Sequence, residues 1–172
     1  MTFDLSPPPL TTAYIALGAN LGAARQVVQA AIAALGQLPH TRLLAASALY
    51  RTAPVGLANQ PDFINAVAAV QTTLEAPALL YALQAEEARQ GRIRSIPNAP
   101  RTLDLDLLLY GERVLNTPFL TLPHPRLHLR AFVLAPLAEI APDLSLPGRS
   151  NVRAWLPAVA MQRITRLSPE SV

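Results

Sequence analysis

The sequence predicts an α+β domain in which two helices pack on one face of a mainly antiparallel, four-stranded sheet. Segments rich in β-branched and aromatic residues alternate with segments whose apolar residues recur at helical spacing, and glycine or proline marks most boundaries. The chain of 172 residues is 51% hydrophobic and 15% charged, so one domain can bury most of its apolar surface. We expect residues 1–11, which include Pro7 to Pro9, to form an extended leader and residues 12–172 to form the domain.

The first half of the chain predicts the order strand, helix, strand, strand. Residues 12–17 form the first strand, and the glycines of residues 18–22 turn the chain into the helix. The helix is indicated by apolar residues at helical spacing, namely Val27, Val28, Ala31, Ile32 and Leu35, and it is ended by Gly36 and Pro39. Residues 42–50 and 64–73 are the next two strands. The connection between them, residues 52–62, is too long for a tight hairpin and is a candidate binding loop.

The second half predicts a helix over residues 78–90, with Pro77 in its first turn and Gly91 at its end. A loop, residues 92–101, leads to a strand over residues 103–110. Alternation along this strand places four leucines on one face and two aspartates on the other: Leu103, Leu105, Leu107 and Leu109, against Asp104 and Asp106.

After a Pro/His-rich stretch at residues 120–128, a short helix over residues 131–140 is expected to be interrupted or kinked at Pro136, and a loosely patterned tail follows. The resulting order β-α-β-β-α-β is that of the ferredoxin-like sandwich. This order predicts a fold and not a function.

The composition limits the possible chemistry. Without cysteine, a bound metal must be held by carboxylates, histidines or backbone oxygens, which favours a hard cation such as magnesium. The N-terminus has no signal-peptide pattern, and no apolar run approaches the roughly 20 residues of a membrane span. We therefore expect a soluble, cytoplasmic protein that does not bind membranes.

Positive charge is concentrated in one part of the chain. All 14 basic residues are arginines, and seven of them lie between positions 89 and 130, where only three acidic residues oppose them. Because the planar guanidinium group binds phosphate in bidentate fashion, this cluster beside two aspartates suits a metal-bound polyphosphate. For any single one of these residues, a general bias towards arginine over lysine is the more common explanation.

Asp104 and Asp106 are the candidate metal ligands. Side chains at i and i+2 of a strand point the same way with Cα atoms roughly 6.6 Å apart, which suits two magnesium ions about 3.5–4 Å apart. Paired strand carboxylates also occur on plainly solvated faces. The metal hypothesis is favoured by Arg101 just upstream and by Arg92 and Arg94 in the same loop, because phosphoryl transfer depends mainly on positioning and charge neutralisation.

Three other residue types are ambiguous when considered alone. His124 lies between Pro123 and Pro125 and could face a phosphate or a metal, or simply belong to a surface loop. Phe63 and Asn65 could stack on a flat heterocycle and hydrogen-bond its edge, but Phe63, like Phe132, could equally belong to the core.

Seven motifs in order resemble one family. They are TAYIALGANLG, LYRTAPVG, QPDFINAV, GRIR, PRTLDLDLLLYG, LTLPHPR and RAFVLAPLAEIAP, which together cover about residues 12–142. The chain resembles 6-hydroxymethyl-7,8-dihydropterin pyrophosphokinase of folate biosynthesis, and PRTLDLDLLLYG is the most specific motif. The resemblance implies a ferredoxin-like enzyme that transfers pyrophosphate from ATP to the hydroxymethyl group of the pterin, releases AMP and uses two Mg²⁺ ions.

The resemblance also implies roles for individual residues. Asp104 and Asp106 would bind both metals, and Arg92 and Arg101 would neutralise the transferring phosphates as catalytic residues on a mobile loop. The implied ATP-binding residues are Gln84, Glu87, Arg92, Arg94, Arg101, Thr121, His124 and Arg130. The implied pterin-binding residues are Thr52, Ala53, Val55, Phe63, Asn65 and Phe132.

The loop over residues 95–100 (SIPNAP) departs from the family pattern. It is about one residue shorter, and it lacks the basic residue and the tryptophan often found before Gly-Pro-Arg, with Ala99 in place of that glycine. Its two prolines and its alanine predict a stiffer lid.

Two alternatives remain open. The ferredoxin-like order and the basic character are shared by RNA-binding modules, although the predicted strands lack the exposed aromatic residues on which bases stack. A nucleotidyl- or phosphoryltransferase with a different alcohol as acceptor would keep the same metal site. We expect small-molecule substrates, no nucleic-acid partner and a monomer.

Overall fold

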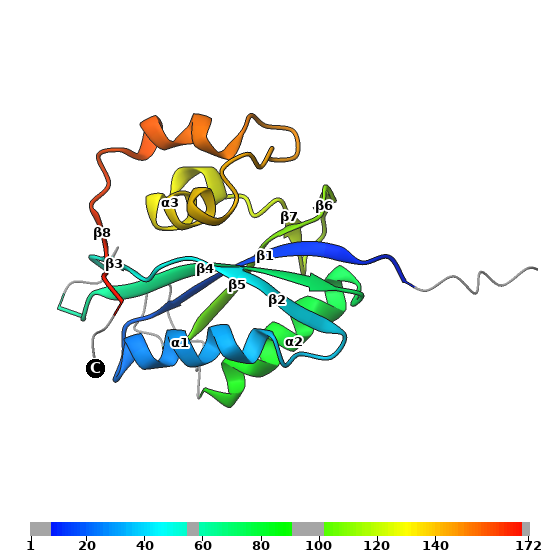
Figure 1. The fold of residues 1–172 in the computed structure, drawn as a ribbon, viewed down its shortest axis with the longest axis horizontal. Coiled ribbons are helices and arrows are strands. Elements are labelled where there is room, and N and C mark those ends of the chain that lie inside the picture. Colours follow the sequence, from blue (N-terminus) through cyan, green and yellow to red (C-terminus); the bar gives the residue numbers. More distant parts are fainter. Residues whose placement is uncertain (1–7, 55–58, 91–101, 170–172) are drawn as a thin grey trace, which may run out of the picture.

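The computed structural model describes residues 8–54, 59–90 and 102–169 and shows an α+β fold built on an antiparallel sheet (Figure 1). The sheet has six strands in the order β5-β1-β4-β3-β8, with β2 also paired to β4. Its strands are β1 (Thr11–Ala19), β2 (Thr41–Ala46), β3 (Tyr50–Thr52), β4 (Phe63–Thr72), β5 (Asp104–Tyr110) and β8 (Ile164–Arg166). The predicted class is confirmed, with six strands in the sheet where four were expected.

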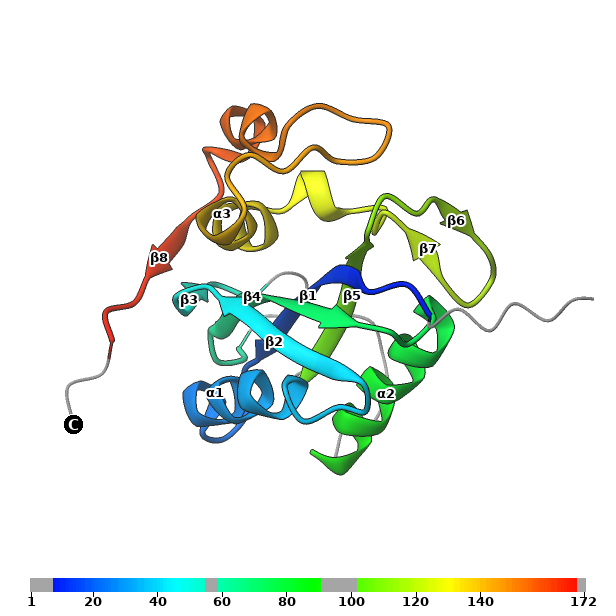
Figure 2. The same cartoon turned by 45° about the vertical axis from the view of Figure 1, so that its right-hand side comes forward.

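Helices cover both faces of the sheet (Figures 1 and 2). Helices α1 (Ala24–Leu35) and α2 (Ala76–Arg89) lie on one face, as predicted. Helix α3 (Ala131–Ile140) lies on the opposite face, and the 3₁₀ helix η2 (Val152–Val159) packs on α3, on the side away from the sheet. The expectation that helices occupy only one face is therefore wrong, because Val67 and Leu108 present a second apolar surface that Leu134 covers. Among the described helices, none is long and apolar enough to cross a bilayer.

The single strand expected over residues 42–50 is two strands, β2 and β3, which both pair with β4. Ser47 separates them. Its backbone N–H donates to the Val67 carbonyl at 2.9 Å, and its hydroxyl accepts the Val67 N–H at 3.0 Å. A serine side chain thus replaces a backbone acceptor at the break, and β3 continues towards the long connection after Thr52.

Strand β5 contains a bulge that corrects the predicted alternation. Tyr14 pairs with Leu109 and Ile15 with Leu107, so Leu108 is the extra residue. Leu107 packs in the core below α1 and α2, whereas Leu108 and Leu109 pack towards α3. The predicted placement of Leu109 with the other three leucines is therefore wrong, while Asp104 and Asp106 precede the bulge and keep a common face.

The C-terminal tail is ordered over its described length. Asn151 caps η2 by accepting the Arg153 N–H at 2.9 Å, and β8 then pairs with β3. A second, two-stranded sheet of β6 (Leu115–Asn116) and β7 (Thr121–Leu122) projects beside β5 (Figure 2). A short 3₁₀ helix, η1 (Leu127–Leu129), precedes α3, and α3 runs through Pro136 without the interruption that the sequence suggested.

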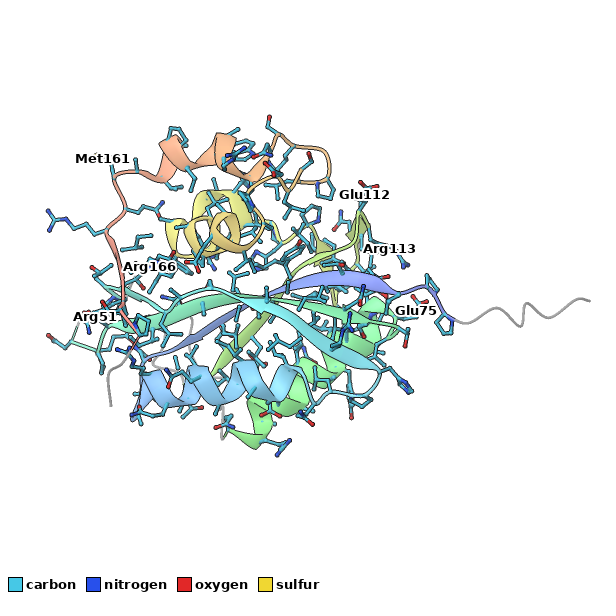
Figure 3. The ribbon with its side chains drawn as sticks, viewed as in Figure 1. Arg51, Glu75, Glu112, Arg113, Met161 and Arg166 are labelled. Carbon is cyan, nitrogen blue, oxygen red and sulfur yellow. The ribbon has the colours of Figure 1, made fainter. Side chains whose placement is uncertain are left out.

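Glu139 on α3 joins three segments through its carboxylate. It accepts the Ala48 N–H at 2.8 Å and the Tyr50 hydroxyl at 2.7 Å, and it forms an ion pair with Arg166 at 3.3 Å (Figure 3 labels Arg166). Burial by itself would raise the pKa of Glu139, but the hydrogen bonds from Tyr50 and Ala48, with the help of Arg166, outweigh it and lower that pKa. For the Tyr50 phenol, burial and the neighbouring carboxylate raise the pKa to about 12.

Glu139→Gln is expected to lower the free energy of unfolding at neutral pH by about 1–2 kcal/mol, since it loses charge-assisted hydrogen bonds. A lowered folded-state pKa means that the carboxylate stabilises the fold above its ordinary pKa of 4.5, and that this stabilisation is lost as pH falls through the folded value. The stability difference between wild type and variant should therefore shrink between pH 7 and pH 3 in urea titrations. Glu112→Gln, at an exposed turn position labelled in Figure 3, is the control. If the difference in the free energy of unfolding stayed constant over this pH range, the lowered pKa of Glu139 would be contradicted.

Candidate active site

Two cavities contain residues predicted for the site, and the larger of them, about 410 Å³, lies between the sheet and α3. Asp104 and Asp106 of β5 line it together with five of the residues predicted to bind a pterin: Thr52, Ala53, Phe63, Asn65 and Phe132. These seven residues come from four separate parts of the chain, and folding brings them to one side of the sheet. The cavity walls are mainly apolar with a few polar groups, as is usual for small-molecule sites.

The smaller cavity, about 300 Å³, lies between α2, β5 and the loop that joins β6 to β7. Gln84, Thr121 and His124, three of the residues predicted to bind ATP, line it. Asp106 lines both cavities, so a group held by this carboxylate is accessible from either side.

The two aspartates are placed by strand pairing. Asp104 lies opposite Gly18 and Asp106 opposite Ala16 on β1, and these small neighbours leave space above the carboxylates. Within residues 8–54, 59–90 and 102–169, no three His, Cys, Asp or Glu side chains gather as a metal site. Two carboxylates fit Mg²⁺ nevertheless, because Mg²⁺ is usually bound by one or two carboxylates together with waters and substrate phosphates.

Asn65 is buried, with 6% of its surface exposed, at the base of the larger cavity. Its Nδ2 donates to the Thr52 hydroxyl at 2.8 Å, and a Cβ at Gly18 would lie only 2.9 Å from its Oδ1. The side chain of Thr52 thus orients Asn65. Gly18 leaves the space that the Asn65 amide occupies.

His124 is oriented by its neighbours. Its backbone N–H donates to the Leu108 carbonyl at 2.9 Å, and its Nδ1 accepts the Arg126 N–H at 3.2 Å. Burial, followed by the positive charges of Arg130 and Arg126, lowers the pKa of His124 to about 4 against the opposing effect of Asp104. The neutral ring therefore carries its proton on Nε2, which can donate a hydrogen bond to an anionic oxygen.

Arg130 lies in the larger cavity, although the sequence grouped it with the residues of the nucleotide. Its guanidinium carbon is 5.5 Å from the centroid of the Phe132 ring, within the range of a cation–π interaction. Its positive charge also helps to lower the pKa of His124, which lines the smaller cavity.

Glu87 does not line either cavity. Its side chain is 2% exposed, and Oε2 accepts the Leu105 N–H at 2.9 Å, between the two aspartates of β5. Glu87 therefore holds the β5 backbone at the open edge of the sheet, and its contact with ATP stays a prediction.

Four predicted site residues lie outside the described residues: Arg92, Arg94 and Arg101 of the basic loop, and Val55 of the long connection.

The cavities also contain residues that sequence reasoning missed. Arg126, Leu129 and Gln162 line the larger one, and Phe119 lines the smaller one. The arginine in LTLPHPR was an available signal for Arg126. No sequence signal indicated Gln162, because it lies in the loosely patterned tail and lines the cavity only after the tail has folded back.

Known proteins resemble this chain over most of its length. The family model of 7,8-dihydro-6-hydroxymethylpterin-pyrophosphokinase (HPPK) matches residues 14–142. The 2-amino-4-hydroxy-6-hydroxymethyldihydropteridine pyrophosphokinase of Pseudomonas aeruginosa is 51% identical over 154 residues, which cover 90% of this chain and 95% of that protein. The protein of the same name from Haemophilus influenzae is 42% identical over 160 residues, covering 93% and 100%.

Solved structures support the fold. Plasmodium falciparum HPPK-DHPS A437G with pteroate matches with a TM-score of 0.70 at 13% identity, over 88% of this chain and 41% of that one. An HPPK-DHPS in complex with substrates matches with a TM-score of 0.67 at 13% identity, over 87% and 43%. The chain thus spans about two fifths of these solved chains, and at this identity the likeness shows a common fold alone.

Proposed function

This chain belongs to the 7,8-dihydro-6-hydroxymethylpterin-pyrophosphokinase family, and on that premise we propose how its two cavities divide the substrates of pyrophosphate transfer. The reaction moves the terminal pyrophosphate of ATP onto the hydroxymethyl oxygen of 6-hydroxymethyl-7,8-dihydropterin and releases AMP, a step of folate biosynthesis. The observation that carries the assignment is Asp106, which lines both cavities and so lies where a donor and an acceptor can meet.

The larger cavity takes the pterin. Phe63 and Phe132 offer aromatic surfaces to a flat ring, and the buried amide of Asn65 offers hydrogen bonds to its edge. The hydroxymethyl group then points towards Asp104 and Asp106, because these residues are the acidic part of the same cavity wall.

The smaller cavity takes ATP. Gln84, Thr121 and His124 provide polar groups, and Leu80 and Phe119 provide apolar surface for a base. Asp104 and Asp106 would hold two Mg²⁺ ions, which when bound neutralise the phosphates and draw charge from the leaving AMP. Arg92, Arg94 and Arg101 complete the charge neutralisation in this proposal, as the family motif implies.

The chemical step makes one bond and breaks one. The pterin hydroxyl oxygen attacks the β-phosphorus of ATP, the bond from this phosphorus to the α,β-bridging oxygen breaks, and the hydroxyl proton is lost to solvent or to a phosphate oxygen. His124 donates its Nε2 proton in a hydrogen bond to a phosphate oxygen, and Arg130 adds positive charge from the larger cavity. Exclusion of water by the filled cavities favours transfer to the pterin over hydrolysis.

The deciding experiment is the product analysis of ATP incubated with the protein and Mg²⁺, with and without the pterin. Pyrophosphate transfer predicts AMP and pterin diphosphate in equal amounts, only when the pterin and Mg²⁺ are both present. Pyrophosphate as product would indicate nucleotidyl transfer, and ADP would indicate simple phosphoryl transfer. No turnover together with salt-sensitive binding of single-stranded RNA would favour the RNA-binding alternative.

The strand order of the sheet supports the ferredoxin-like fold that the sequence predicted. The order β5-β1-β4, continued by β2 and β3 as one interrupted strand, is the order expected for the ferredoxin-like core, with β8 added at one edge. We propose that residues 12–172 act as one domain, since β8 of the tail pairs with β3 of the main sheet, and that this domain acts as a monomer.

Phe119 is proposed to stack on the adenine ring. Although 88% exposed, it lies on the wall of the smaller cavity, and Thr117 braces its loop by donating to the Leu120 carbonyl and accepting the Leu120 N–H, both at 3.0 Å. Phe119→Ala is expected to raise the KM for ATP about 5–20-fold with little change in the KM for the pterin, because a base–aromatic stack contributes about 1–3 kcal/mol.

Steady-state kinetics with each substrate varied in turn test this prediction. The matched control is Tyr81→Ala, which removes a 76% exposed ring from α2 outside the cavity. If both variants shifted the KM for ATP equally, or neither did, Phe119 would have no specific role in nucleotide binding.

A further inference from the structure

Gln162 belongs to the C-terminal segment, beyond the residues that the family model matches. It follows Met161 at the turn between η2 and β8 (Figure 3) and donates its backbone N–H to the Val159 carbonyl at 3.0 Å. Its side chain nevertheless lines the larger cavity with Arg130 and Phe132. A residue from the tail thus forms part of the wall of the site.

The Gln162 amide makes two hydrogen bonds to the backbone on either side of Arg130. Oε1 accepts the Ala131 N–H at 2.9 Å, and Nε2 donates to the Leu129 carbonyl at 2.8 Å. Both bonds join segments more than 30 residues apart in the chain. The single planar amide therefore fixes the distance and direction between the end of η1 and the start of α3.

Arg130 is the one residue between η1 and α3, and its backbone is extended, with φ −124° and ψ 117°. It occupies the N-cap position of α3, but its side chain makes no capping hydrogen bond. The first N–H of the helix is one of the groups that a helix leaves unsatisfied, and here Gln162 accepts it.

The backbone conformation at Arg130 decides where the side chains of Arg130 and Phe132 lie in the cavity. The Arg130 guanidinium packs over the Phe132 ring at 5.5 Å, and both side chains depart from backbone within two residues of the hydrogen bonds to Gln162. A rotation at Arg130 would move the aromatic wall and the positive charge together. Errors of about 1 Å in such positions are costly to catalysis.

The tail that carries Gln162 is itself anchored. Strand β8 pairs with β3, the Leu167 N–H donates to the Leu49 carbonyl at 2.8 Å, and Arg166 forms the ion pair with Glu139 of α3. These contacts hold the segment against the same helix whose start Gln162 caps.

We propose that Gln162 is a positioning residue for the pterin cavity, which holds Arg130 and Phe132 in place through the backbone on both sides of Arg130. This inference rests on the proposed function in that it takes the larger cavity as the acceptor site. It assigns a role in substrate recognition to the part of the chain after residue 142.

The test is Gln162→Met, which keeps the length of the side chain and removes both hydrogen bonds. We expect the KM for the pterin to rise about 5–20-fold, as follows from two partly exposed hydrogen bonds, while the KM for ATP stays within twofold. Gln162→Glu keeps an acceptor for Ala131 but has no donor for Leu129, so its pterin KM should lie between those of Gln162→Met and wild type. Met161→Ala, at the neighbouring 95% exposed position, is the matched control and should behave as wild type.

A double-mutant cycle separates positioning from general stability. If Gln162 acts through Phe132, its effect on the pterin KM should largely disappear in a Phe132→Ala background, whereas a merely structural role would add to that of Phe132→Ala. An active wild type with an unchanged pterin KM in Gln162→Met, or with fully additive effects in the cycle, would overturn the inference. An inactive wild type would instead overturn the proposed function, so the two failures are distinguishable.

Discussion

Asp106→Asn is expected to lower kcat about 10³-fold or more, the largest effect of any substitution considered. Asparagine keeps the shape of the side chain and removes the negative charge, and Asp106 is the carboxylate shared by both cavities. The loss should appear in the chemical step, because a carboxylate that holds Mg²⁺, as we propose for Asp106, matters most where charge is redistributed between the phosphates. Asp104→Asn should also be severe, since both residues project from the same face of β5.

Three measurements separate a catalytic loss from an unfolded variant. The Kd for the pterin without nucleotide should stay within a few-fold of the wild-type value. The midpoint temperature of thermal unfolding should be unchanged or slightly raised, because one of two neighbouring like charges is removed. The dependence of turnover on Mg²⁺ concentration should weaken. Asp143→Asn, at an exposed aspartate paired with Arg153 at 3.2 Å, is the control and should retain full activity. Near-normal kcat in Asp106→Asn and Asp104→Asn would refute the metal assignment.

Asn65→Leu is expected to raise the KM for the pterin on the order of 100-fold with a much smaller change in the KM for ATP. Leucine has the same branching and the same number of side-chain heavy atoms but cannot hydrogen-bond, so polar groups on the pterin edge and the Thr52 hydroxyl would lose their buried partner. The effect is larger than that expected for Phe119 because Asn65 is buried and water cannot replace the lost bonds.

Thr52→Val is a milder variant that tests the same contact. It removes the 2.8 Å hydrogen bond that orients Asn65 but leaves the amide in the cavity. The KM for the pterin is therefore expected to rise about 3–10-fold. Direct titration of the pterin, followed by fluorescence, measures both variants without turnover. If Thr52→Val were as damaging as Asn65→Leu, or Asn65→Leu had no effect, the amide could not be the principal polar contact.

Much of the fold follows from local patterns. Apolar spacing predicted α1, and the boundary signals Pro77 and Gly91 predicted α2, which extends from Ala76 to Arg89 instead of from 78 to 90. Alternation predicted β5 and the common face of its two aspartates, because a period of two is a property of any extended strand. These elements persist in the structure since hydrophobic patterning and backbone geometry point to the same arrangement.

The bulge in β5, the break between β2 and β3, and the strand β8 could not be predicted from local patterns. Leu108 is an extra residue only relative to β1, and Ser47 ends β2 only by its bonds to Val67. A three-residue strand such as β8 has almost no local signal and exists because β3 offers it an unpaired edge. Each of these features depends on a partner far away in the sequence.

Local patterns and the family motifs predict the residue types of the site, namely two aspartates at i and i+2, a basic loop before them, and aromatic and amide groups for a flat acceptor. How these residues divide depends on the fold, which places Asn65 and Phe132 in one cavity, His124 in the other and Asp106 in both, with Glu87 bonded to the edge of β5. The reason is physical: the side chains of a motif follow from its chemistry, but a cavity is made by strand pairing and helix packing between distant segments. Gln162 is the clearest case, because its place in the site depends entirely on where the tail folds back.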